Sequence, residues 1–142
     1  MLLKETVEAS TLDLIHRLMA DEDLLEFNLV GGTALALMFG HRISIDIDLF
    51  TNNPFDAEKL GKLLSAKYKV DNLETDNNTI NCFIEDVKVD YIAHCYPWIQ
   101  PAFFLEDIRM ASIEDIAAMK FNAIVQDGVP APNKLDSFLK VV

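Results

Sequence analysis

The chain has 142 residues, which is enough for one domain with a hydrophobic core but hardly for two. Twelve Lys and Arg residues stand against 23 Asp and Glu residues, which gives a formal net charge of −11 at pH 7. This acidity argues against general, sequence-independent binding to nucleic acid, because such binding needs a basic surface. It leaves room for a local basic patch that recognises one RNA.

Cellular location is predicted from the cysteines and the N-terminus. Cys82 and Cys95 stand outside any Cys/His cluster, so we expect two buried thiols in a reducing compartment. Residues 1–5 turn acidic without the apolar segment of a signal peptide. No run of the sequence approaches the roughly 18 apolar residues that a membrane span needs. These features predict a cytoplasmic protein with no membrane partner.

Apolar residues at helical spacing predict a helix over residues 4–20, followed by a turn at residues 21–23. A short segment then leads into a first strand that ends at the pair Gly31 and Gly32. A short apolar helix is expected to begin near Thr33 and to return tightly into a second strand. The first 50 residues are therefore expected to run helix, strand, helix, strand.

Asn53 and Pro54 predict the start of the next helix, as its cap and its first residue, and this helix should end near Lys67. Alternating polarity and intervening turns predict three further strands: 69–74, 79–84 and 88–93. Together these elements predict an α/β (α+β) protein. Its mixed sheet should have four to five strands, flanked by helices.

The last third of the chain should be a loop followed by a helix. The prolines of residues 94–101 predict the loop, in which we expect Trp98 to pack as a plug, with base stacking as the alternative. Ser112 should cap the helix, with Asp115 at the capping-box position. Lys120 lies on this helix near its apolar stripe, where a snorkelling surface lysine is the alternative to a functional one.

Asp46 and Asp48 carry the most informative pattern. They share one face of the second strand, because successive side chains of a strand point to opposite faces, and their Cα atoms should be about 6.5–7 Å apart. By the same alternation, Ser44 and Arg42 lie on this face. Two carboxylates this close repel each other unless one is protonated or a cation lies between them. Oxygen-only ligands favour Mg²⁺ or Mn²⁺ over zinc.

The two glycines supply the other half of this expected site. Without a Cβ, Gly31 and Gly32 let a ligand approach the backbone closely. They also open the helix near Thr33, whose free N–H groups favour an anion such as phosphate. Metal-binding acids that face a phosphate-binding helix start predict phosphoryl or nucleotidyl transfer.

Asp90 is a third acid of interest. It is a carboxylate in an otherwise apolar strand, on the face opposite Val89 and Tyr91. A solvated residue on an edge strand is the alternative interpretation. Asp86 is the competing candidate, although it falls in an expected turn.

The order Gly31-Gly32-Thr33, then Asp46-Ile47-Asp48-Leu49, resembles the polymerase-β-type nucleotidyltransferases. More narrowly, residues 29–35 followed by residues 41–50 resemble the AbiEii/AbiGii-type toxin branch. The resemblance implies a Mg²⁺-dependent (or Mn²⁺-dependent) enzyme that transfers a nucleoside monophosphate from a nucleoside triphosphate to an RNA or protein acceptor. It further implies a toxin-like role in a toxin–antitoxin or phage-defence system, with tRNA or a protein as acceptor and a cognate antitoxin as partner.

The resemblance also implies roles for individual residues. Asp46 and Asp48 would hold the metal, and Asp90 would be the third acid that completes the metal site and helps to activate the acceptor hydroxyl. The residues expected at the nucleotide are Gly31, Gly32, Thr33, Arg42, Ser44 and Lys120. Among these, the glycines and Thr33 would cradle the outer phosphates.

The resemblance covers roughly residues 25–125. We expect a single nucleotidyltransferase-like domain over residues 1–142, with the part after about residue 126 shortened or altered, since Pro130 and Pro132 block a helix there. A shortened end raises the alternative of a catalytically inactive relative that acts as a binding or regulatory module. A further alternative is a small-molecule nucleotidyltransferase of the antibiotic-modifying kind.

Overall fold

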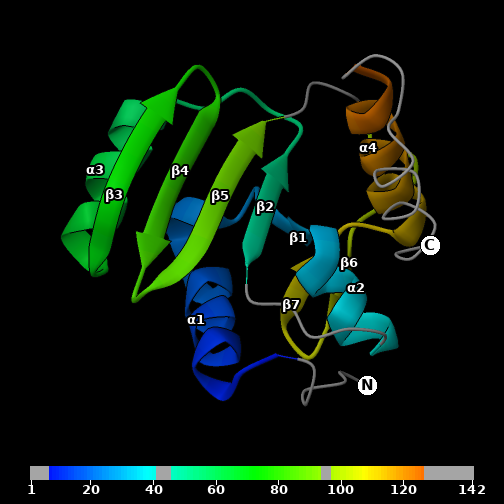
Figure 1. Ribbon diagram of the computed structural model, residues 1–142, viewed down its shortest axis with the longest axis horizontal. Coiled ribbons are helices and arrows are strands. Elements are labelled where there is room, and N and C mark those ends of the chain that lie inside the picture. Colours follow the sequence, from blue (N-terminus) through cyan, green and yellow to red (C-terminus); the bar gives the residue numbers. More distant parts are fainter. Residues whose placement is uncertain (1–6, 41–45, 94–96, 127–142) are drawn as a thin grey trace.

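The computed structural model describes residues 7–40, 46–93 and 97–126, with only the backbone for residues 120–126 (Figure 1). The first half of these residues forms α1 (Ala9–Ala20), the 3-10 helix η2 (Glu22–Leu24), β1 (Asn28–Val30), α2 (Gly31–Phe39), β2 (Ile47–Thr51) and α3 (Ala57–Lys67). The second half forms β3 (Val70–Asp76), β4 (Thr79–Ile84), β5 (Val87–Ala93), β6 (Phe103–Leu105), β7 (Ile108–Met110) and α4 (Ile113–Gln126).

The described strands form one mixed sheet in the order β3-β4-β5-β2-β1-β7-β6. The pairs β2–β5 and β1–β7 are parallel and the other pairs are antiparallel. The predicted α+β class with a mixed sheet is thus confirmed. The predicted strand count of four to five is wrong, because the sheet has seven strands in the described part of the chain. The unpredicted strands β6 and β7 have three residues each, too few to show an alternating pattern.

Helices α1 and α3 cover one face of the sheet, and Figure 1 shows β3, β4, β5 and β2 in front of them. The side chains on the covered face are almost fully buried, among them Ile47, Leu49, Val89 and Tyr91. The alternate residues of β2 and β5 point to the opposite face and are only half-buried. Helices α2 and α4 lie toward the β1 and β7 end of the molecule (Figure 1). The face that carries the alternate residues is therefore the more open one over β4 and β5.

Two predicted helix boundaries are wrong. Helix α1 begins at Ala9 rather than at residue 4. Helix α3 begins at Ala57, and its cap is Asp56, whose carboxylate accepts a hydrogen bond of 3.1 Å from the Lys59 N–H. The expected cap, Asn53, instead donates its own N–H to the Thr51 hydroxyl at the end of β2. A second capping residue three positions later therefore determined where the helix starts.

Cys82 lies on β4 with its side chain buried, as predicted, while Cys95 falls outside the described residues. Burial, together with the nearby Asp90 carboxylate, raises the pKa of the Cys82 thiol to about 12. None of the described helices combines the length and the apolar character needed to cross a membrane.

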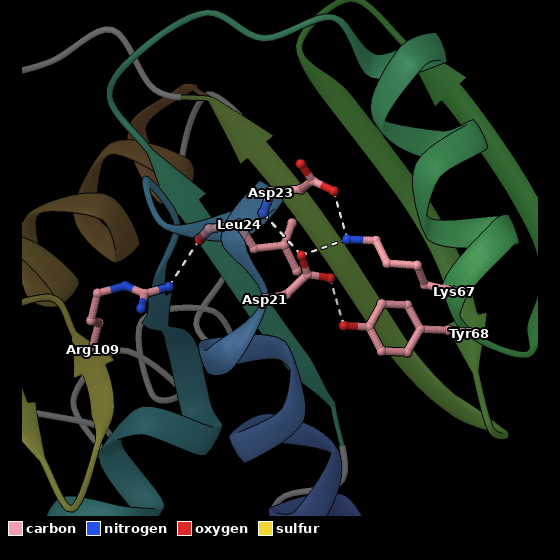
Figure 2. A network of polar contacts seen from close by, with 6 residues as sticks. All are labelled: Asp21, Asp23, Leu24, Lys67, Tyr68 and Arg109. Atoms are coloured by element: carbon pink, nitrogen blue, oxygen red, sulfur yellow. Dashed lines mark hydrogen bonds and ion pairs between the residues drawn. The ribbon is translucent and has the colours of Figure 1, made fainter.

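A polar network ties the end of α1 to the end of α3 (Figure 2). The Lys67 ammonium lies 2.6 Å from one carboxylate oxygen each of Asp21 and Asp23. The Tyr68 hydroxyl donates a 2.7 Å hydrogen bond to the other Asp21 oxygen. Burial alone would raise the pKa of Asp21, but the bonds from Lys67, Tyr68 and the Asp23 N–H outweigh it and leave that pKa below its ordinary value.

This network predicts a pH-dependent contribution of Asp21 to stability. A lowered pKa in the folded state means that the carboxylate stabilises the fold above the ordinary pKa of 3.8, and that this contribution is lost as the pH falls below that value. We expect Asp21→Asn to lower the free energy of unfolding by about 1–2 kcal/mol at neutral pH. Urea unfolding between pH 3 and pH 7 should show this difference shrinking toward acid. Asp13→Asn, at an exposed carboxylate, is the control and should change little.

Candidate active site

Asp48 on β2 and Asp90 on β5 lie directly beside each other in the sheet. The two strands pair in parallel, and the Cα partner of Asp48 in this register is Asp90. Paired residues on neighbouring strands stand about 5 Å apart and point to the same face. Asp46 is exposed and comes one residue before β2, next to the same pair of strands. Acids that are 42 residues apart in sequence are thus brought together on one face.

Gly31, the first residue of α2, lies against the Asp48 carboxylate. β1 pairs with β2 so that Val30 stands opposite Asp48, and the helix starts at the next residue. Gly31 has a φ of 75°, in the left-handed region that glycine adopts at little cost. A Cβ at this position would lie 2.5 Å from Asp48 Oδ2. This turn therefore requires glycine both for its backbone and for the space beside the carboxylate.

Thr33 joins α2 to the start of β2. Its side chain is buried, and its hydroxyl donates a short hydrogen bond to the backbone carbonyl of Asp46. Gly31 and Gly32 are half-exposed, so the backbone at the helix start stays open to solvent. In this arrangement the two glycines leave the N-terminus of α2 accessible to solvent, and Thr33 holds the backbone of the segment that carries Asp46.

Asp90 is an acid in an unfavourable environment. Its side chain is only 15% exposed, and its Oδ1 atom is buried with no hydrogen-bond partner among the described residues. Its Oδ2 atom lies 3.7 Å from the Lys88 ammonium. Burial raises the pKa of Asp90, the charge of Asp46 adds to the rise, and Lys88 opposes it. A cation placed at this carboxylate would relieve both the burial and the repulsion.

The donor set fits a hard divalent cation. As placed, no three Asp, Glu, His or Cys side chains within the described ranges are close enough together to form a metal site. However, Asp48 and Asp90 offer adjacent carboxylates, and the buried Oδ1 of Asp90 is an oxygen that needs a partner. Carboxylate oxygens without sulfur or imidazole suit Mg²⁺ or Mn²⁺. The residues present therefore fit the metal that the sequence predicts.

Three of the predicted nucleotide-binding side chains cannot be placed. Arg42 and Ser44 lie outside the described residues. Lys120 is on α4, but only its backbone is described. The competing acid Asp86 lies in the turn between β4 and β5 with a φ of 67°.

Sequence reasoning missed the role of Asp115. Ser112 caps α4 as predicted, since its hydroxyl oxygen accepts a hydrogen bond from the Asp115 N–H. The Asp115 carboxylate is buried, and it accepts hydrogen bonds from the N–H groups of Ile99 (2.7 Å) and Gln100 (3.1 Å). It therefore anchors the loop that carries Trp98, which packs half-buried against the core as predicted. A buried acid is not distinguishable in the sequence from an ordinary first-turn acid.

Known proteins share this fold and sequence pattern. A family model of the nucleotidyl transferase AbiEii toxin, type IV TA system, matches residues 13–133. An uncharacterized protein of Aquifex aeolicus, aq_aa25, is 34% identical over 107 residues, which are 72% of this chain and 52% of that protein. The chain thus spans about half the length of this curated relative.

Two solved structures have the same fold at low identity. The polyadenylate synthase of Megavirus superposes with a TM-score of 0.58 at 14% identity, over 91% of this chain and 30% of the viral protein. JHP933 from Helicobacter pylori superposes with a TM-score of 0.56 at 21% identity, over 93% of this chain and 65% of that protein. Since the family model covers most of its residues, the chain belongs to the family of the nucleotidyl transferase AbiEii toxin of type IV TA systems.

Proposed function

We propose that the protein is a Mg²⁺-dependent (or Mn²⁺-dependent) nucleotidyltransferase that moves a nucleoside monophosphate from a nucleoside triphosphate to a hydroxyl of an RNA or protein. The observation that carries the proposal is the lateral pairing of Asp48 with Asp90 beside the Gly31 helix start. Family membership supports the reaction class. The sheet register supplies the adjacent carboxylates that this reaction class needs.

In this proposal Asp46, Asp48 and Asp90 would hold the metal, which supplies positive charge at the reacting phosphate. The acceptor hydroxyl oxygen forms a bond to the α-phosphorus, and the bond from that phosphorus to the bridging oxygen breaks, so pyrophosphate leaves. The Asp90 carboxylate takes the hydroxyl proton. Its paired position beside Asp48 orients it toward the same reacting centre.

The start of α2 would receive the triphosphate. The first N–H groups of a helix generally lack intrahelical partners, and the half-exposed Gly31 and Gly32 would leave room here for phosphate oxygens. Thr33 would act through Asp46, whose backbone it holds. Arg42, Ser44 and Lys120 are proposed to complete the phosphate and nucleotide contacts.

The proposal extends to the biological setting. The family is described as a nucleotidyl transferase toxin of a type IV TA system. We therefore propose a toxin-like role in toxin–antitoxin or phage defence, with a cognate antitoxin as partner. A tRNA or a protein is the proposed acceptor. The formal charge of −11 favours recognition of one such acceptor at a local surface over general binding to nucleic acid.

The test is transfer of label from each of the four α-³²P nucleoside triphosphates to total tRNA, to a cell protein extract and to small aminoglycosides, with Mg²⁺ or Mn²⁺. We expect label in RNA or protein, and a loss of at least about a thousandfold in Asp48→Asn, because removing one metal ligand forfeits several kcal/mol of transition-state stabilisation. Asp86→Asn, in the turn outside the site, is the matched control and should stay active.

Label in the aminoglycosides alone would show a small-molecule transferase instead. If the wild type and Asp46→Ala bind nucleotide with equal affinity, and the wild type transfers no label, the protein would be a binding module. Either result would contradict the proposal.

A further inference from the structure

Lys88 is a cation near the three carboxylates of the proposed site, and the proposed reaction does not use it. It lies two residues before Asp90 on β5, so both side chains point to the same open face of the sheet. Its ammonium is 3.7 Å from Asp90 Oδ2. Asp46 comes directly before Ile47, which pairs with Val89, so it lies at the same end of the two strands. Lys88 therefore pairs with one acid of the proposed metal site, at the end of the strands where Asp46 lies.

We propose that Lys88 is a positioning residue that serves as an internal counter-ion. In the metal-free protein its ammonium neutralises the carboxylates and holds Asp90, and binding of the divalent metal displaces it. This inference rests on the proposed function, because it assumes that the carboxylates are the metal site.

The geometry explains why a lysine can do this. The Lys88 side chain is 49% exposed, so its flexible stem can move into solvent without leaving a cavity in the core. Asp90, in contrast, is only 15% exposed, and its buried Oδ1 atom has no hydrogen-bond partner among the described residues. Without a nearby cation, the Asp90 carboxylate would experience only the unfavourable effect of burial and the repulsion from Asp46. Lys88 is the cation whose ion pair with Asp90 the structure describes.

The proposed exchange of the Lys88 ammonium for the metal has two measurable consequences of opposite sign. Removing the ammonium leaves the carboxylates uncompensated, so the metal-free protein loses stability. The same removal ends the competition between the ammonium and the metal for Asp90, and it ends their mutual repulsion. From Coulomb's law in water, with screening by salt and a separation of about 5 Å, we expect Mn²⁺ to bind roughly three- to tenfold more tightly to Lys88→Met than to the wild type. A residue with only a structural role would not tighten metal binding.

The experiment measures thermal unfolding and Mn²⁺ titration calorimetry on the full chain, without nucleotide. Lys88→Met should lower the melting temperature in EDTA by a few degrees and should recover most of it when Mn²⁺ is saturating. Lys88→Arg should restore the wild-type values, because it keeps the charge. Lys62→Met removes an exposed lysine from α3, on the other side of the sheet, and should change neither quantity.

The outcomes separate this inference from the proposed function. Wild-type binding of Mn²⁺ that Asp48→Asn abolishes, with unchanged or weaker binding by Lys88→Met, would overturn the role of Lys88 and leave the metal site intact. Absence of Mn²⁺ binding in the wild type would overturn both. Tighter binding by Lys88→Met, reversed in Lys88→Arg, would establish the exchange.

Discussion

Gly31→Ala should lower the rate of nucleotidyl transfer by about a hundredfold or more and should destabilise the fold. The φ of 75° costs an alanine about 1–2 kcal/mol, and its Cβ would lie 2.5 Å from Asp48 Oδ2. Either the Asp48 carboxylate or the start of α2 must therefore move. A displacement of about 1 Å at a reacting centre costs on the order of a hundredfold in rate. Transfer kinetics and urea unfolding of the variant should show a loss of about a hundredfold or more in kcat/KM, beyond the loss of stability.

The matched control for this prediction is Gly40→Ala. Gly40 caps the other end of α2 with a φ of 68°, so an alanine there meets the same backbone cost. We expect a similar fall in stability from the backbone term, with transfer activity largely kept at temperatures where the variant is folded. Equal losses of activity in the two variants would mean that contact with Asp48 is not what makes Gly31 necessary.

Arg109→Met should give the largest loss of stability. The Arg109 guanidinium donates hydrogen bonds to three backbone carbonyls, those of Met19 (3.0 Å), Leu24 (2.9 Å) and Phe27 (3.2 Å). Figure 2 shows its reach from β7 to Leu24. Met19 and Leu24 lie at the ends of α1 and η2, where helix carbonyls commonly lack intrahelical partners, and Phe27 directly precedes β1. Removing the guanidinium takes a donor from each of the three carbonyls, although that of Leu24 keeps a hydrogen bond from the Phe27 N–H, and should lower the free energy of unfolding by about 3–4 kcal/mol.

Two variants test the reason for this loss. The substitution Arg109→Lys keeps the charge, but one ammonium cannot span three carbonyls, so this variant should recover less than half of the stability. Arg17→Met removes an arginine with two ion-pair partners that is 41% exposed, and it should cost less than about 1 kcal/mol. Urea unfolding measures all three. A cost for Arg17→Met equal to that for Arg109→Met would attribute the effect to charge rather than to the backbone carbonyls.

The elements that could be predicted were those whose evidence is local. β4 has the predicted bounds because six alternating residues between two turns are a complete strand signal. The face shared by Asp48 and its neighbours follows from the period of a strand. That Asp90 stands beside Asp48 required the sheet order, because β2 and β5 are joined through α3, β3 and β4 before they pair in parallel. No local pattern contains that register.

The features that could not be predicted depend on tertiary contacts. The hairpin of β6 and β7 exists because β7 pairs with β1 at Leu29 and Met110, not because three residues favour a strand. Asp115 could be placed in a first turn, but not under the Ile99 loop. The spacing of Lys88 and Asp90 places them on one face of a strand, whereas the counter-ion role of Lys88 emerges only from burial and distance. Sequence periodicity indicates which side chains share a face of a strand or helix, but it does not indicate which elements pack against that face.

The outer strand β3 has a further consequence for how molecules of this protein behave together. It is the last strand at its end of the sheet, it is interrupted by an irregularity between Asp71 and Glu74, and Asn72 adopts a φ of 52°. Its exposed residues include Asp71, Glu74 and Asp76. Negative charges and a local kink disfavour the pairing of two such edges into a continuous intermolecular ribbon. The edge strand β3 should therefore disfavour fibrillar aggregation of the protein in concentrated solution.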